Sequence, residues 1–219
     1  MSDDAKLSVF DFVVTTQVAT KLPFMQVVDD DILRKEGVIE EGFDLIGDPT
    51  NGVTYKELKY EGKSISCKPD KLVFNFELSK IDHGTIVPSV EKLINIVPAI
   101  SLNACGINFS VFKKQENAGR DILQRLICAK EFAKEAEKAS VQLIYEKKIL
   151  DTHKSQLHLD VVSGVSSSNG QEESGFIVRF NYHHKIESRK DAKAIISEYK
   201  KYYNDANQIA SSVLDAVNG

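Results

Sequence analysis

The chain has 219 residues, 42% of them hydrophobic, and a formal net charge of −4. This length and hydrophobic content are sufficient for a packed core in one large domain or in two small halves. The acidic balance argues against sequence-independent binding of nucleic acid, because such binding needs an excess of Lys and Arg to displace counterions. We therefore expect no nucleic-acid partner.

The start of the chain and its cysteines indicate a cytoplasmic protein. The first ten residues lack the basic start and the long apolar run of a secretory signal. No stretch approaches the roughly 18 consecutive apolar residues of a membrane span, so no membrane contact is expected. Cys67, Cys105 and Cys128 are widely spaced and form no CxxC motif, which argues against disulfides and zinc.

Four features are predicted in the first half of the chain: a strand over 6–19, a short helix over 29–37, a three-stranded meander over 53–78 and a helix over 86–97. The three acidic residues 29–31 are assigned to capping of the short helix rather than to a metal site, because acids favour a helix N-terminus. Turns at 61–62 and 69–70 divide the meander and place Leu58, Ile65 and Phe74 in one row.

Six elements are predicted in the second half: strands over 99–112, 140–150, 156–162 and 176–186, a helix over about 118–138, and a C-terminal helix of about 28 residues. The apolar phase of the first of these strands changes at Gly106, where we predict a β-bulge. Ser188, followed by Asp191 three residues later, is typical of the start of a helix.

The loop between the last two strands contains Asn169 and Gly170, which favour a hairpin turn. A turn centred there pairs residues whose numbers sum to 339, so that Leu157 faces Tyr182 and apolar side chains meet apolar ones throughout. A longer loop with the same parity is the alternative.

The adjacent residues His183 and His184 lie in a strand pattern, so their side chains point to opposite faces and cannot both bind one metal ion. The polar face of the last three strands gathers six candidate binding residues: Glu146, His158, Asp160, Arg179, Asn181 and His183. Histidine, carboxylate and arginine together could bind an anion or carry out acid–base chemistry. The alternative is a solvated face with a cross-strand ion pair between Asp160 and Arg179.

The order of elements predicts an α+β fold in which an extended antiparallel sheet carries helices on one face. Residues 1–98 and 99–219 read alike as β-α-β-β-β-α, which indicates a structural pseudo-repeat within one continuous globular unit. In architecture the chain resembles the duplicated TATA-box-binding-protein-like or helix-grip arrangement. A shared fold does not carry function, and the acidity of this chain argues against DNA binding.

The sequence contains no phosphate-binding, dinucleotide-binding, zinc-protease or serine-hydrolase motif, and no catalytic residue, cofactor or metal is assigned. The first functional hypothesis is a non-catalytic interaction module that uses the uncovered sheet face to bind a protein partner or a second copy as a homodimer. The second is a ligand-binding protein or enzyme with a cavity between the sheet and the C-terminal helix. The residues that would line this cavity are Tyr182, His184, Tyr199 and Tyr203.

Overall fold

The computed structural model describes residues 6–16, 30–39, 44–46, 56–68, 70–97, 102–126, 138–150, 154–168 and 171–218. The strands of this part of the chain are β1 (Val9–Thr16), β2 (Asp44–Ile46), β3 (Lys56–Tyr60), β4 (Lys63–Lys68), β5 (Lys71–Glu77), β6 (Leu102–Lys114), β7 (Ser140–Lys147), β8 (Ser155–Ser168) and β9 (Gln171–Lys185). Its helices are α2 (Asp30–Lys35), α3 (Ile86–Ile96), α4 (Ala118–Asp121), α5 (Arg189–Ser197) and α6 (Tyr199–Asn218), with a 3-10 turn η2 (His83–Thr85) and a π-helical turn η3 (Ile122–Leu126).

The nine described strands form one antiparallel sheet in the order β2-β3-β4-β5-β1-β6-β9-β8-β7. The α+β class and the antiparallel sheet are thereby confirmed. Strands β1 and β6 lie side by side in the middle of the sheet. Outward from β1 follow β5, β4 and β3, and outward from β6 follow β9, β8 and β7. This order is compatible with two alike halves, and the duplication itself stays a prediction.

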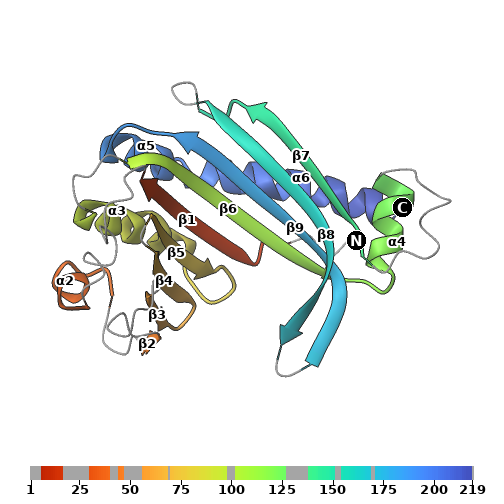
Figure 1. Cartoon of the computed structure of the whole chain (residues 1–219), viewed down its shortest axis with the longest axis horizontal. Helices are drawn as coiled ribbons and strands as arrows, with labels where there is room; N and C mark the ends of the chain where they lie inside the picture. The colour runs from red at the N-terminus through yellow and green to blue at the C-terminus, as the bar shows by residue number, and fades with distance from the viewer. Residues whose placement is uncertain are drawn as a thin grey trace.

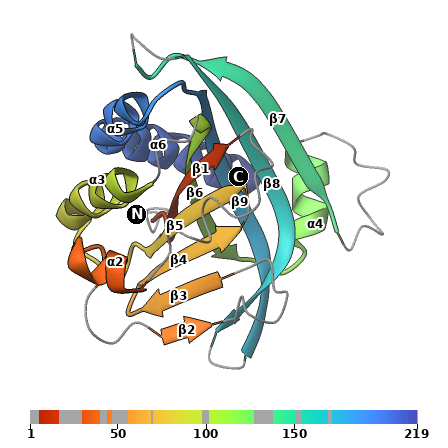
Figure 2. The same cartoon turned by 60° about the vertical axis from the view of Figure 1, so that its left-hand side comes forward.

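Helices α3, α5 and α6 cover one face of the sheet (Figures 1 and 2). The strands alternate in burial, so β1 turns Phe10 and Phe12 into a core that includes Phe74 and Phe76 of β5. Apolar residues of α6 recur at helical spacing and close this core from the other side. We call the helix-covered side the core face and the opposite side the open face.

The predicted register of the last hairpin is confirmed. Residues of β8 and β9 pair with numbers that sum to 339, and Leu157 faces Tyr182. The strands extend further than the sequence indicated, up to the pair Ser168 and Gln171, so the alternative of a longer loop is wrong. The turn residues 169 and 170 lie outside the described residues. The meander register is also confirmed, because Ile65 faces both Leu58 and Phe74.

The β-bulge predicted at Gly106 is wrong. Gly106 pairs regularly with Val13 on one side and His183 on the other. The irregularity lies three residues earlier, where the pairing with β1 skips Asn103. The Thr15 hydroxyl donates a 2.8 Å hydrogen bond to Asn103 Oδ1 at this point, so a polar contact accompanies the shift.

The C-terminal helix begins as predicted but is not continuous. The Ser188 side chain accepts a 3.3 Å hydrogen bond from the Asp191 N–H, which confirms the cap. At Glu198 the backbone leaves the helical region, and its N–H bonds to Ile195 O at 3.2 Å in a tighter turn. The predicted helix over 118–138 is described only as α4 and η3, and residues 127–137 lie outside the described residues. Strand β2 was not predicted from the sequence.

Candidate functional site

The open face of β7, β8 and β9 carries all six candidate binding residues. The pairing places Asp160 beside Arg179, His158 beside Asn181, and Gln156 beside His183. Residue Glu146 follows in the same row as Gln156. The structure therefore brings these side chains onto one surface, as the alternation of the strands predicted.

The ion pair expected between Asp160 and Arg179 does not form within the described part of the chain. Asp160 Oδ1 instead accepts a 2.8 Å hydrogen bond from Gln142 Nε2 of β7. Arg179 is exposed, and no described residue forms an ion pair with it. The open face thus presents a guanidinium group, with five N–H donors in a planar fork, to solvent.

His183 and His184 point to opposite faces, as predicted. His183 lies half-buried on the open face, where desolvation chiefly lowers its pKa, and His158 and Lys185 lower it further. His184 is fully buried on the core face, with Nε2 3.0 Å from the Tyr202 hydroxyl. Among the described residues no group of three or more His, Cys, Asp and Glu side chains is arranged to hold a metal ion.

A second polar cluster lies at the centre of the open face, and it was missed from the sequence. Asp11 of β1 lies between Asn75 of β5 and Asn108 of β6, and Asn75 Nδ2 donates a 2.5 Å hydrogen bond to Asp11 Oδ1. Burial raises the pKa of the Asp11 carboxyl, while Asn75 and Lys71 oppose that rise. Asn108 Oδ1 is buried without a hydrogen-bond partner among the described residues. The signal in the sequence is a single Asp within the apolar run VFDFVV.

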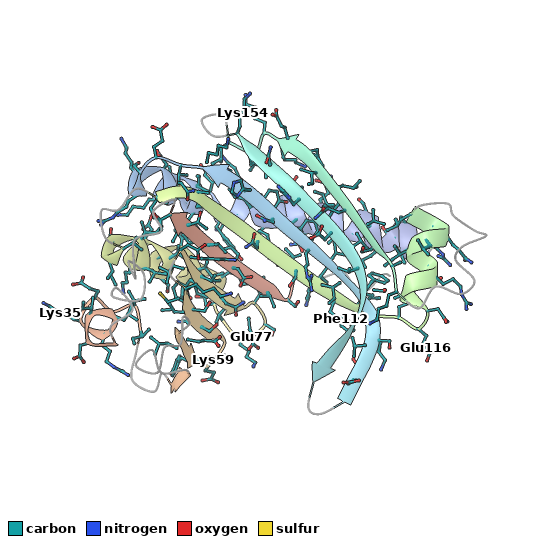
Figure 3. The ribbon with its side chains drawn as sticks, in the orientation of Figure 1. Lys35, Lys59, Glu77, Phe112, Glu116 and Lys154 are labelled. Atoms are coloured by element: carbon teal, nitrogen blue, oxygen red, sulfur yellow. The ribbon has the colours of Figure 1, made fainter. Side chains whose placement is uncertain are left out.

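The open face is hollowed beside this cluster. A depression of about 420 Å³ lies over β3, β4, β5 and β1. Its lining consists of Asp11, Glu57, Lys59, Tyr60, Lys63, Ser64, Ser66, Val73, Asn75 and Glu77. Figure 3 labels Lys59 and Glu77 of this set. The mixture of both charges with amide and hydroxyl groups is suited to a polar protein surface rather than to an apolar ligand.

The residues of the alternative cavity pack against one another. Tyr182, His184 and Tyr199 are at most 2% exposed, whereas Tyr203 is half-buried. Tyr202, from the same tyrosine cluster of the C-terminal helix, contacts Tyr182 and His184, with ring centroids 5.2 and 5.5 Å apart. Burial raises the pKa of Tyr182, Tyr199 and Tyr202, so their hydroxyls stay protonated at neutral pH. This part of the sheet–helix interface is therefore filled by aromatic rings.

A smaller hollow of about 350 Å³ lies between α6, η3 and the end of β7. It is lined by Leu126, Lys147, Asp205, Gln208, Ile209, Ser212, Val213 and Ala216. At its wall, Asp205 accepts a 2.8 Å hydrogen bond from the Tyr182 hydroxyl and forms a 2.7 Å ion pair with Lys147. The Asp205 carboxylate thus already binds two side chains of the same chain, Tyr182 and Lys147.

Comparison with known proteins finds no family model that matches this chain and no curated protein that is similar to it. None of the described helices has the length and apolar character that crossing a membrane requires.

Proposed function

We propose that this protein is a non-catalytic interaction module of the cytoplasm that binds a protein partner with the open face of its sheet. The observation that carries the proposal is the composition of that face on β7, β8 and β9. The exposed residues Arg179 and Asn181 lie there together with Ile144, Val162 and Ile177. The helices α3, α5 and α6 lie on the opposite side of the sheet and do not cover these residues (Figure 1). Arginine among scattered apolar side chains is typical of protein interfaces.

The architecture supports the same proposal. We infer that the two halves are a pseudo-duplication of the TATA-box-binding-protein-like or helix-grip kind, because the sheet order mirrors itself about the pair β1 and β6. Such a sheet leaves a long surface free on the side without helices. The net charge of −4 favours a protein over a nucleic acid as the partner of this surface.

The test is native mass spectrometry of the full chain purified without denaturation from its own host. We expect a complex with a second polypeptide of reproducible stoichiometry. Arg179→Glu should abolish this complex, because it places a carboxylate beside Asp160. Lys200→Glu makes the same charge change at an exposed position of α6 and should leave the complex intact. A complex that survives Arg179→Glu would overturn the proposal.

The second candidate function is the binding of a small ligand, and one observation favours it. The hollow beside α6 combines the apolar residues Leu126, Ile209 and Val213 with the Lys147–Asp205 ion pair. Its volume of about 350 Å³ falls within the range of small-molecule sites. An extra mass that is retained reproducibly on the monomer in the same experiment would favour this function over the first.

A further inference from the structure

Strand β7 forms one edge of the sheet of nine described strands, and it carries exposed side chains on both of its faces. Leu143 is 52% exposed, Ile144 55% and Tyr145 38%, although all three are large apolar residues in consecutive positions. The run from Val141 to Tyr145 contains neither a charged residue nor a proline. Natural sheets protect their edges with lysine, proline or bulges, because an unprotected edge pairs with other strands.

The hydrogen-bond phase shows which backbone groups of β7 face this edge. Ser163 N–H donates to Ala139 O at 2.9 Å, and the Ser155 hydroxyl donates to Lys147 O at 2.5 Å. The odd-numbered residues of β7 therefore turn their backbone groups toward β8. In an antiparallel pair the direction alternates, so the N–H and C=O groups of Gln142, Ile144 and Glu146 point away from β8.

The positively charged end of β7 does not protect the edge. Lys147 Nζ lies 2.7 Å from Asp205 Oδ1 of α6, so its ammonium group lies on the core face and not at the outer edge of β7. The five residues from Val141 to Tyr145 are uncharged, and two of them, Gln142 and Ile144, have backbone groups that point outward.

We propose that β7 pairs antiparallel with β7 of a second copy, so that the two sheets continue into one another across a twofold axis at Ile144. This interaction is separate from the partner site proposed above. In this register Ile144 faces its own counterpart on the open face, and Leu143 faces Tyr145 of the second copy on the core face. Gln142 faces Glu146 of the second copy, so no two like charges meet. The outward backbone groups of Ile144 bond to one another, as a hydrogen-bonded pair requires.

The strand is self-complementary, and this is the reason for choosing a second copy as the occupant. A register in which the numbers of paired residues add up to an odd value would set core-face residues against open-face residues. The Ile144-centred register instead sets Ile144 against Ile144 on the open face and Leu143 against Tyr145 on the core face. Strand β7 has eight residues, so the contact area is small compared with that of a permanent dimer. We therefore expect a reversible dimer whose population increases with concentration.

The test is analytical ultracentrifugation of the full chain over a wide concentration range. The wild type should shift from the monomer to the dimer mass. Ile144→Lys should remain monomeric at concentrations at least about tenfold higher, because two ammonium groups would face each other at the axis. Val165→Lys is the matched control: Val165 is also 55% exposed and lies on a strand, but outside β7. It should dimerise like the wild type.

Amide hydrogen exchange tests the register within the dimer. The amides of Gln142, Ile144 and Glu146 should exchange more slowly as the concentration rises, whereas those of Leu143 and Tyr145 should not change. A wild type that stays monomeric, a dimer that persists in Ile144→Lys, or a dimer lost equally in Val165→Lys would each overturn the proposal. Arg179→Glu should leave the dimer unchanged, so failure of this proposal and failure of the partner site are distinguishable.

Discussion

At the scale of single residues, buried hydroxyl groups hold the C-terminal helix to the sheet. Tyr182 of β9 is fully buried, and its hydroxyl donates to Asp205 of α6 at 2.8 Å. Tyr202 of α6 reaches back to His184 of β9 at 3.0 Å. Each element contributes one tyrosine hydroxyl to these two contacts, and together they connect α6 with β9 at two points.

Replacement of Tyr182 by Phe should lower the free energy of unfolding by about 1–2 kcal/mol, because a buried hydrogen bond to a carboxylate is lost while the ring remains. Urea unfolding followed by circular dichroism measures this change. Tyr203→Phe is the control, because no described residue forms a hydrogen bond with the Tyr203 hydroxyl and the ring is half-buried. Equal losses in the two variants would contradict a role for the bond to Asp205.

Asp11 makes the stability of the protein depend on pH. Its pKa is raised above 3.8 mainly by burial, so ionisation costs more in the folded than in the unfolded state. The stability that its protonated form contributes is present below about pH 3.8 and is lost as the pH rises through the folded pKa. Asp11→Asn should therefore gain stability relative to the wild type between about pH 4 and pH 7. Urea midpoints at the two pH values measure this gain.

Asp70→Asn is the control for this measurement, because Asp70 is exposed in a turn. A change with pH is attributed to Asp11 only where it exceeds the change that Asp70→Asn shows over the same range. If Asp11→Asn and the wild type show the same pH dependence, the carboxyl of Asp11 titrates alike in both states and the assigned effect of burial is wrong.

At the scale of elements, two glycines mark where the β8–β9 hairpin leaves the sheet. Gly164 of β8 and Gly175 of β9 face each other, and Gly175 pairs with Lys114 at the end of β6. A Cβ atom at Gly175 would overlap the carbonyl oxygen of Lys113 and lie 2.7 Å from a ring carbon of Phe112. Backbone and ring can therefore approach β9 closely only because position 175 has no side chain.

Gly175→Ala should lower the free energy of unfolding by about 2 kcal/mol or more, because the overlap is with backbone that cannot move aside. Gly164→Ala should change it by less than about 1 kcal/mol, since its Cβ would meet only Ile177 Cδ1 at 3.4 Å. Thermal unfolding of both variants tests the difference. If the Gly175→Ala protein were as stable as the Gly164→Ala protein, β9 could move away from Phe112 and Lys113 of β6 without a cost in stability.

The elements also show what the sequence can and cannot predict. Alternation in β8 and β9 determined the parity of their pairing, because only one parity buries Leu157, Leu159 and Val161 together. The turn residues Asn169 and Gly170 then selected the register among those of that parity. The bulge was misplaced because the phase change at Gly106 is spread over several residues that are all buried. The break in the helix at Glu198 could not be predicted, because no proline or glycine lies at that position. The cluster of Asp11, Asn75 and Asn108 forms only through pairing between strands that are distant in sequence.

At the scale of the whole molecule, the two predicted halves share one core. Phe109 of β6 contacts Phe10 of β1 with ring centroids 5.3 Å apart, and Phe10 contacts Phe76 at 5.7 Å. Phe109 also lies 5.9 Å from the ring of Tyr199 in α6. One chain of aromatic contacts thus connects β5 with the C-terminal helix, and the described buried residues form a continuous cluster along it.

This continuity predicts that residues 1–98 and 99–219 unfold together. The chain contains no tryptophan, so Tyr60→Trp and Tyr203→Trp can report on the first and the second half separately. In urea both probes should show the same midpoint. Adding Phe109→Ala should lower the free energy of unfolding by about 3–5 kcal/mol at both probes, because the cavity opens in the shared core.

The control is Ile32→Ala, whose side chain in α2 is 41% exposed and should shift neither probe by more than about 1 kcal/mol. A Phe109→Ala variant in which only the Tyr203→Trp signal shifts would show that the halves are independent units. Equal shifts would instead show that the pairing of β1 with β6 transmits stability across the whole sheet, because Phe10 and Phe109 face each other in that pairing.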